Sequence, residues 1–336
     1  MPIPNQGITP GGAIYNELSS LTRRAFMPRV TVQLYYASPT MMTLLGNAQK
    51  FAGGVNQITV PVQGSSMVTG AWTSYSGTFN KPQVIPGVQN AQFSGSYFVV
   101  PVPLVLGEAL LQSTEAVVPI LDVRMNDVYA VTNQQMGSAL FTNNSANPLM
   151  PSGFVEACDN GTNVSSYGGI SRSANSFWQG QYYPSAGAVL TRANMAQYLI
   201  QITDNAGGEA PDFVVMSPSD YATLNSTFIG VEQYNMPPGN AYTMDSVVRS
   251  SFPNLVISGV PFYMDHWCPK GTMYFINSKY TAMYLSEDAP FAFSGFYSAI
   301  PLMQIAQIGV MIVGYNVICT KPGANAVVTG ITGGAF

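Results

Sequence analysis

Four long stretches of this chain, 51–80, 82–107, 128–155 and 289–320, contain no charged side chain. Gly, Pro, Asn, Gln and Ser interrupt each of them before it reaches the ~20 consecutive apolar residues that a membrane-spanning helix needs. Over the whole chain, charged residues make up 8%, where soluble domains carry about 25%. Because hydrophobic residues still amount to 47%, ordinary disorder is excluded. We therefore expect a folded chain whose surface is poor in charge, and no membrane association.

A nearly neutral surface provides little repulsion to keep copies of a protein apart. The cores of protein interfaces are depleted of charge and enriched in aromatic residues and methionine, and this chain has 19 Tyr, 17 Phe and 17 Met. We therefore predict extensive self-association. A monomer with a large core and an uncharged polar surface is the alternative that composition leaves open. Sequence-specific nucleic-acid binding is disfavoured, since only twelve Lys and Arg are available to contact phosphates.

The sequence offers no pattern typical of catalysis, cofactor binding or metal binding. The single histidine, His266, lies two residues before Cys268, and two ligands are fewer than a zinc site requires, so we favour a turn between two strands. Residues 159–163 resemble a calcium loop only loosely. Cys158, Cys268 and Cys319 lack the spacing of a disulfide framework and are expected to be buried free thiols. We predict that the protein is not an enzyme, with no catalytic, cofactor-binding or metal-binding residues and no cofactor.

The first third of the chain predicts extended structure. Residues 1–45 begin with a cluster of Pro and Gly and are expected to form an arm rather than part of a core. Residues 57–105 have a β pattern at both ends and turn-forming residues between them, which predicts a long two-stranded excursion. A hairpin of this kind is marginal alone in water, so we expect it to lie on another subunit. The first residues do not resemble a signal peptide, which favours synthesis in the cytoplasm.

Periodicity changes to helical after this excursion. Residues 117–140 place an apolar or small side chain at every third or fourth position, which predicts a long amphipathic helix that becomes regular near Pro119. We expect loops over 141–188 and then alternating helices and strands. The predicted helices cover 191–204, with Thr191 as cap, and the segment opened by Ser217 and Pro218. The predicted strands cover 212–216, 255–257, 260–264, 273–277, 280–285 and 304–320.

Three short motifs in the second half of the chain occur in a specific order. They are Gly259-Val260-Pro261-Phe262, then Asp265 followed by Cys268-Pro269-Lys270-Gly271, then Tyr274-Phe275-Ile276-Asn277. Together with the strand and helix start at 211–221, and with 169–173 and 177–180 upstream, they resemble the tailed-bacteriophage major capsid proteins. The resemblance covers residues 113–330 in motif and 1–110 in topology only.

This resemblance implies an α+β chain with the Hong Kong 97-type capsid fold. The implied parts are an N-terminal arm (1–45), an extended β-hairpin loop (46–107), a peripheral domain (108–188) with a long spine helix (117–140), an axial α/β domain (189–288), return strands of the peripheral domain (289–320) and a C-terminal segment (321–336).

The implied function is that of a major capsid protein of a tailed double-stranded DNA phage. Such a protein assembles as pentamers and hexamers into an icosahedral head, and is located in the virion capsid. The implied partners are other copies of the chain, a separate scaffolding protein, a portal and cement proteins. The shell would enclose double-stranded DNA without reading its sequence.

Two other classes of protein stay open from the sequence. A tail, decoration or surface-layer protein would share the composition but would lack the strand order expected over 255–285. A hydrolase would need a concave site with shifted titrating groups, for which this chain has few candidates.

Some capsid relatives cross-link their subunits through a lysine. Lys81 is available in the predicted extended loop, but no matching motif surrounds it, so we expect no cross-link.

Overall fold

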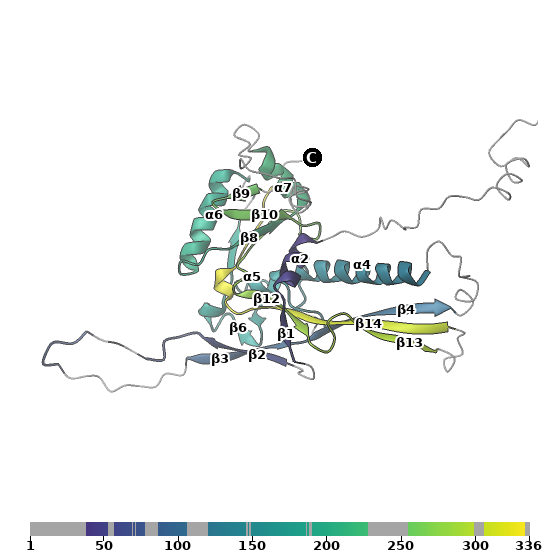
Figure 1. Ribbon diagram of the computed structural model, residues 1–336. Helices are drawn as coiled ribbons and strands as arrows, with labels where there is room; N and C mark the ends of the chain where they lie inside the picture. The colour runs from purple at the N-terminus through teal and green to yellow at the C-terminus, as the bar shows by residue number, and fades with distance from the viewer. Residues whose placement is uncertain are drawn as a thin grey trace, which may run out of the picture.

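The computed structural model of the protein describes residues 38–52, 57–68, 70, 72–77, 87–105, 120–145, 147, 149–185, 187, 190–227, 255–298 and 306–332. Within them the chain is a mixed α+β structure with two larger sheets and a separate two-stranded hairpin. One sheet, with two helices packed on it, forms a compact body, while the other sheet and the longest helix run away from that body side by side (Figure 1).

The compact body is built on a six-stranded sheet with the order β7-β15-β11-β8-β10-β9. Its strands are β7 (Gln181–Pro184), β8 (Phe213–Met216), β9 (Leu255–Ile257), β10 (Val260–Met264), β11 (Thr272–Ile276) and β15 (Ala326–Thr329). Helices α6 (Arg192–Asn205) and α7 (Pro218–Ser226) share a core with one face of this sheet. All four residues of β8 are buried, because Val214 and Met216 pack in the core with these helices while Phe213 and Val215 join a second core on the other face.

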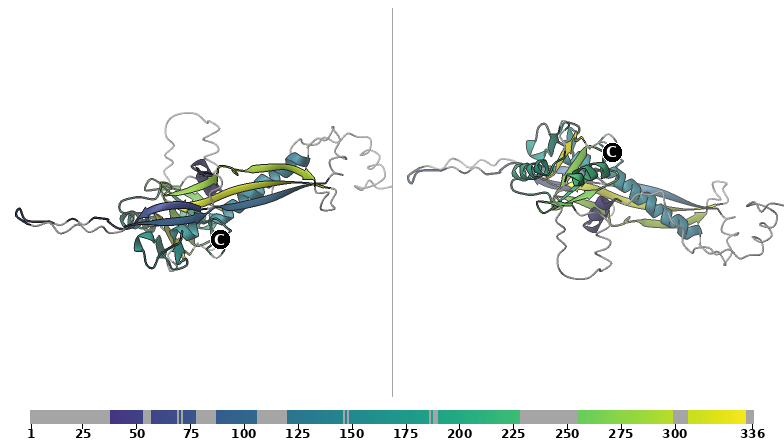
Figure 2. Two further views of the ribbon diagram at one scale, coloured as in Figure 1. Left: turned by 90° about the horizontal axis from the view of Figure 1, so that it is seen from below. Right: turned by 90° about the horizontal axis from the view of Figure 1, so that it is seen from above.

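The second sheet has five strands, and its long strand β14 (Ala306–Cys319) connects the others. The first half of β14 lies between β13 (Ala292–Ser298) and β4 (Ser96–Val105), and its second half pairs with β12 (Thr281–Ser286). The short β1 (Gln49–Phe51) pairs with β12 in parallel. Helix α4 (Ile120–Leu140) runs along this sheet in both further views (Figure 2).

Helix α4 confirms the periodic pattern in the sequence. Four residues of the predicted stripe are buried: Val128, Thr132, Met136 and Leu140. Ile120 is the first described residue of the helix, and the start predicted near Pro119 lies outside the described residues. Beyond its end, the Asn144 side-chain amide donates hydrogen bonds to the carbonyl oxygens of Ala139 (3.1 Å) and Pro151 (2.7 Å). The Ala139 contact satisfies a carbonyl group that a helix end leaves without an intrahelical partner.

The helices and strands predicted for the compact body are also found. Thr191 caps α6 by accepting a hydrogen bond from the Asn194 backbone, and Ser217 caps α7 in the same way, with Pro218 in its first turn. Residues 141–188, expected to be loops, contain short elements that the pattern did not show. They are α5 (Phe154–Cys158), β5 (Ser166–Tyr167), β6 (Ile170–Ser171), the 3-10 turn η1 (Ser176–Trp178) and β7. A further 3-10 turn, η3 (Pro322–Ala324), precedes β15.

The predicted N-terminal arm needs a correction at its end. Residues 1–37 lie outside the described residues, but α2 (Pro39–Gly46) is a helix that belongs to the core. Met41 and Leu44 are buried beside Met136 and Leu140 of α4. Ser38 caps α2 and donates a hydrogen bond of 2.5 Å to Asp265. The physical reason is local: a capping serine, a proline in the first turn and two apolar residues three apart favour a short packed helix.

Residues 57–105, predicted to form one two-stranded excursion, belong instead to a hairpin and to a strand of the five-stranded sheet. Strands β2 (Gln57–Gln63) and β3 (Val88–Ser94) form the hairpin, but β4 leaves it after Gly95 and pairs with β14. Pro101 and Pro103 are compatible with β4 because it is an edge strand, where a missing N–H breaks no second ladder.

The six-stranded sheet and the sequence range 189–288 do not coincide. Strands β7 and β15 lie outside that range in the sequence but belong to the sheet, whereas β12 lies inside the range and pairs in the other sheet.

Candidate functional site

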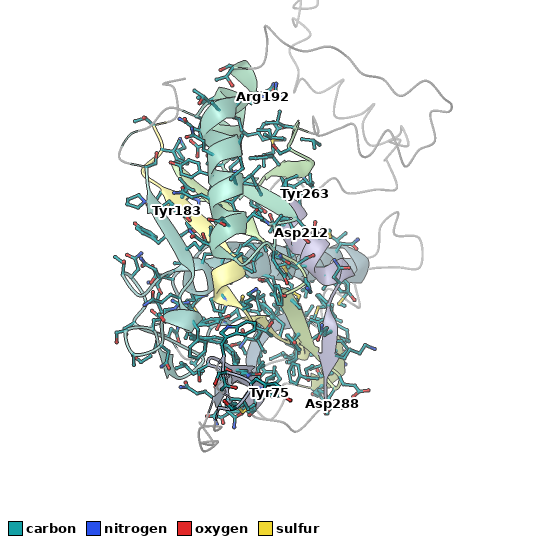
Figure 3. The ribbon with its side chains drawn as sticks, turned by 90° about the vertical axis from the view of Figure 1, so that its left-hand side faces the viewer. Tyr75, Tyr183, Arg192, Asp212, Tyr263 and Asp288 are labelled. Carbon is teal, nitrogen blue, oxygen red and sulfur yellow. The ribbon has the colours of Figure 1, made fainter. Side chains whose placement is uncertain are left out.

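The hairpin carries apolar side chains away from the rest of the chain. Beyond β2, the described residues continue outward (Figure 1), and Trp72 and Tyr75 are fully exposed, with Val68 exposed by 77%. Figure 3 shows Tyr75 and Arg192, the first residue of α6, at opposite ends of the view. Large aromatic residues that are fully exposed in one copy are suited to burial against another.

The base of the hairpin, in contrast, is firmly attached. Backbone Gln92 donates to the carbonyl of Gly168 (2.8 Å), and the Gln89 side chain donates to Asn175 (3.0 Å). Phe93 is buried edge-on against Tyr167, with ring centroids 4.9 Å apart. The hairpin therefore has a fixed root and an outer part that the described residues of the chain do not cover.

A second uncovered surface lies on the five-stranded sheet. Val100 and Val102 of β4 pack with α4 through Val128, so the alternating residues of the strand face the other way. Two of these, Tyr97 and Val99, are about half exposed (54% and 51%). Tyr297 of β13, across from Ile308 of β14, is 66% exposed. Because 289–320 and 96–105 contain no charge, this face resembles an interface core.

A buried charged cluster supports the root of the hairpin. Arg172 has no exposed surface, and its guanidinium donates to the carbonyls of Trp178 (3.3 Å), Val164 (3.2 Å) and Glu156. It also pairs with Asp159 at 3.7 Å. Burial lowers the pKa of Arg172, and the Asp159 carboxylate opposes that shift. A buried arginine with this many partners holds together the loops that carry those partners.

Asp159 has a structural role in this cluster. Its carboxylate accepts hydrogen bonds from the backbone N–H groups of Gly161 (2.8 Å) and Val164 (2.9 Å) and from the backbone and side chain of Asn163. The loop over 159–163, which loosely resembles a calcium loop in sequence, thus directs N–H donors and the Arg172 cation at the carboxylate. Because these donors occupy the carboxylate oxygens that a calcium site would turn toward the cation, the arrangement is the reverse of a calcium site.

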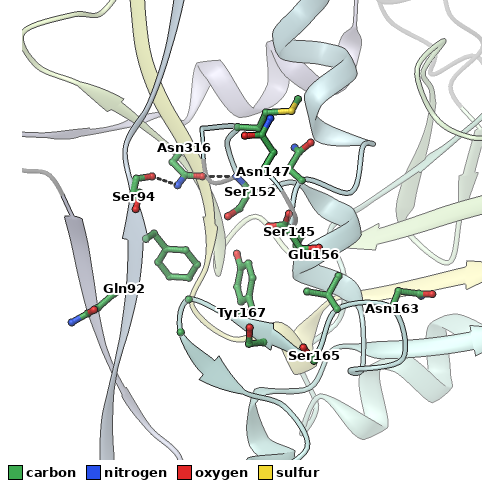
Figure 4. A pocket seen from close by; sticks show the side chains of 17 residues that line it. Gln92, Ser94, Ser145, Asn147, Ser152, Glu156, Asn163, Ser165, Tyr167 and Asn316 are labelled. Atoms are coloured by element: carbon green, nitrogen blue, oxygen red, sulfur yellow. Dashed lines mark hydrogen bonds between the residues drawn. The ribbon is translucent and has the colours of Figure 1, made fainter.

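A polar cavity of about 430 Å³ lies between the hairpin root, the loop after α4 and the β5–β6 turn (Figure 4). Asn, Ser and Gln side chains dominate its lining, and Glu156 is its one acidic residue. Asn316 crosses one side, donating to the Ser94 carbonyl (2.6 Å) and accepting from the Ser152 backbone (2.9 Å). Burial raises the pKa of Glu156, against the opposing effect of hydrogen bonds from Ser152 and the Asn144 backbone.

The two residues considered as zinc ligands lie in a turn, as predicted. His266 and Cys268 lie between β10 and β11, where the Trp267 backbone donates to Asp265 at 3.0 Å. Burial, with Asp265 and Asp220 adding to it, raises the pKa of the Cys268 thiol well above its ordinary value. A buried thiol of this kind is inert.

The described residues contain neither a metal-binding cluster nor a membrane-spanning helix. No group of three or more His, Cys, Asp or Glu side chains there is arranged to hold a metal ion. Among the described helices, none combines the length and apolarity needed to cross a bilayer. All three cysteines are free and buried, as expected from their spacing.

Sequence reasoning missed the Arg172 cluster. The segment 169–173 entered the comparison with capsid proteins, but no role was attached to its arginine. The sequence signal that could have identified the cluster is the small number of charged residues. Asp159 and Arg172 lie close together in a segment that is otherwise uncharged. Scarce charges within an apolar segment are often buried as a pair.

No protein-family model and no curated protein sequence matches this chain, but solved structures do. Similar structures include the capsid asymmetric unit of cyanophage A-1(L), with a TM-score of 0.70 and 14% identity over 94% of this chain and 99% of that one. The capsid of a native GTA particle has a TM-score of 0.64 and 10% identity over 96% and 100%. The SrpI encapsulin complex of Synechococcus elongatus PCC 7942 has a TM-score of 0.61 and 10% identity over 96% of both chains.

These similarities define a class of protein by fold. The chain has the mixed α+β fold of phage capsid proteins, and it matches such subunits over nearly their whole length. The resemblance drawn from the motifs at 211–280 is therefore confirmed at the level of the fold. Mycobacterium phage and bacteriophage PhiM1 structures show the same fold with lower TM-scores.

Proposed function

We propose that the protein is the major capsid protein of a tailed double-stranded DNA bacteriophage, assembling as pentamers and hexamers into an icosahedral head. The observation that carries the proposal is the near-complete match of 94% of this chain to 99% of a cyanophage capsid subunit. The charge-poor hairpin and sheet face support it, because they supply uncovered surface for neighbouring copies. The chain is a structural protein and needs neither catalysis nor a cofactor for this role.

The parts of a Hong Kong 97-type subunit can be assigned within this proposal. The hairpin β2–β3 and the residues beyond it are the extended loop, and α4 is the spine helix of a peripheral domain built on the five-stranded sheet. The six-stranded sheet with α6 and α7 is the axial domain, which gathers around the five-fold and six-fold positions. The strand order over 255–285, which a tail, decoration or surface-layer protein would lack, supports this assignment.

Assembly in this proposal depends on area rather than on a single site. Each subunit offers several moderate, nearly uncharged surfaces, and closed symmetry lets many weak contacts act together. The chain has twelve basic and sixteen acidic residues. This balance suits a container that encloses double-stranded DNA without binding it specifically. A separate scaffolding protein, a portal and cement proteins are the further partners, with synthesis in the host cytoplasm and a final location in the virion capsid.

Expression of the full chain, alone and together with its neighbouring genes, tests this function. Size exclusion followed by negative-stain microscopy should show closed shells, or rings of five and six subunits. The matched variant replaces residues 65–86 with an Asn-Gly turn between Gly64 and Gly87, whose backbone groups are hydrogen bonded (2.9 Å). This variant should fold, with an unchanged melting temperature, but should not close shells. A stable wild-type monomer in both preparations, or normal shells from the variant, would contradict the proposal.

A further inference from the structure

Two glycines face each other where the hairpin leaves the body of the subunit. Gln63 pairs with Val88 at the end of the β2–β3 ladder, and the next backbone hydrogen bond joins Gly64 to Gly87 at 2.9 Å. A Cβ atom at Gly64 would clash with the aromatic ring of Phe177. The hairpin backbone therefore lies directly against the Phe177 ring at its point of exit, and a larger residue at position 64 would have to displace that ring.

Phe177 is held by the buried cluster beneath it. It belongs to the turn η1, next to Trp178, which has no exposed surface and whose indole donates to the Tyr167 carbonyl at 2.8 Å. Arg172 holds the same turn through the Trp178 carbonyl at 3.3 Å. A continuous series of contacts thus runs from the Arg172–Asp159 pair through Trp178 and Phe177 to the hairpin.

We propose that Phe177 is a positioning residue that sets the direction in which the hairpin leaves the subunit, and that this direction selects the curvature of the assembled shell. The inference rests on the proposed shell function and deepens it. Gly64 is the contact point, and the Arg172 cluster is the rigid support. Phe177 and Gly64 can act in this way without touching a neighbouring copy.

A small change in backbone direction at Gly64 produces a large displacement farther along the hairpin. Eleven positions separate Gly64 from Tyr75 in the sequence, which an extended chain spans in at most ~36 Å at ~3.3 Å per residue. A tilt of ~10° at Gly64 would therefore displace Tyr75 by up to ~6 Å over that span. The fully exposed Trp72 and Tyr75 would then meet a different part of the neighbouring subunit. A local change would alter subunit geometry without disturbing either of the two main cores.

The Gly64→Ala, Phe177→Ala and double variants test this role in the full-length chain, with Gly70→Ala as the matched control. Gly70 lies farther out in the same excursion, and a Cβ there would have nothing within 4 Å. The readouts are the shell diameter distribution by electron microscopy and the melting temperature of the unassembled subunit. Phe177→Leu provides a second, bulk-conserving variant in case Phe177→Ala lowers the melting temperature.

Gly64→Ala should reduce the yield of wild-type-diameter shells at least tenfold, with an unchanged melting temperature. Phe177→Ala should broaden the diameter distribution, and adding it to Gly64→Ala should restore part of the yield because the clash is gone. Gly70→Ala and Phe177→Leu should resemble the wild type.

Normal shells from Gly64→Ala, or equal losses from Gly64→Ala and Gly70→Ala, would overturn the positioning role while leaving the shell function intact. A lowered melting temperature that accounts for every loss would also overturn it, since Phe177 would then serve stability alone. Failure of the wild-type chain to form shells would instead reject the proposed function itself.

Discussion

Strands β8 and β2 are both uncharged and rich in β-branched or apolar residues, yet only one of them is covered by its own chain. All four residues of β8 are buried, whereas β2 alternates between exposed and half-buried residues. Strand β8 lies between β10 and β11, and β2 pairs with β3 alone. The comparison separates apolar surface used for the fold of one subunit from apolar surface left for contact between subunits.

The same difference predicts how mutations in the two regions act. Changes in the six-stranded sheet should lower the stability of the isolated subunit, and changes in the outer hairpin should lower assembly only. The expected loss in the free energy of unfolding of the unassembled subunit therefore decreases from the sheet core to the outer hairpin.

Phe275→Ala should have the largest effect. Phe275 has no exposed surface and lies in β11 across from Val214 of β8 and Ala326 of β15. Truncating a buried phenylalanine leaves a cavity and costs about 3–5 kcal/mol. Denaturant unfolding of the subunit should show this loss. An unchanged unfolding midpoint would mean that the sheet is not the stabilising core of the subunit.

Ser217→Ala should have an intermediate effect. The Ser217 hydroxyl caps α7 by accepting from the Asp220 backbone at 3.2 Å, and it also donates to the Asp220 carboxylate at 2.7 Å. Loss of such a cap costs about 0.5–2 kcal/mol. The control is Ser226→Ala at the other end of the same helix, where the exposed serine bonds only to Thr223 (2.7 Å). Equal unfolding energies for the two variants would contradict the capping role.

Glu156→Gln should produce a smaller, pH-dependent gain. Burial raises the pKa of Glu156 above its ordinary value of 4.5, so the folded state holds this proton more tightly than the unfolded state does. Wild-type stability is then lost as pH rises from 4.5 through the folded pKa. Glutamine has no such proton, so the melting temperature of the variant relative to the wild type should increase over this range.

Glu209→Gln is the control for the pH experiment because its shift has the opposite sign. Hydrogen bonds from Tyr280 and Lys279 lower the pKa of Glu209, so the wild-type contribution is present at neutral pH and is lost as pH falls through the folded pKa. This variant should gain nothing at neutral pH. A similar neutral-pH gain in both variants would indicate a general charge effect instead.

The double variant Trp72→Ala/Tyr75→Ala should have the smallest effect on subunit stability. Both side chains are fully exposed, and such surface changes usually alter stability by less than about 0.5 kcal/mol. Shell formation, measured by sedimentation, should nevertheless be strongly reduced because the aromatic contact area is gone. Normal shell yields would show that the outer hairpin does not form a contact between subunits.

Sequence patterns anticipated the regular elements well where local chemistry decides them. The stripe in α4 and the caps at Thr191 and Ser217 depend on neighbours three or four residues away, and they were found as predicted. The expected resemblance to capsid proteins was confirmed at the level of the fold. Lys81 and residues 1–37 fall outside the described residues, so the expectations about cross-linking and about most of the arm stay predictions.

The sequence did not predict strand partners or side-chain packing that depend on residues far apart in the chain. Nothing in the residues around Ser96 indicates that β4 leaves the hairpin for β14, which is distant in the sequence. Met41 and Leu44 looked like part of an arm until α4 and the turn at Asp265 supplied a surface for them. Arg172 lacked an assigned role because most of its partners are backbone carbonyls, which sequence does not identify.

The sequence by itself determined that this chain folds and that it is poor in charge, which follow from composition, and where its main regular elements lie, which follows from short-range periodicity. The resemblance to capsid proteins came separately, from the order of short motifs in the second half of the chain. The tertiary structure alone decided which apolar strands are covered, where the hairpin root is fixed and that Gly64 rests on Phe177. Those outcomes depend on packing between residues far apart in the chain, and packing at atomic distance is not encoded in any local pattern.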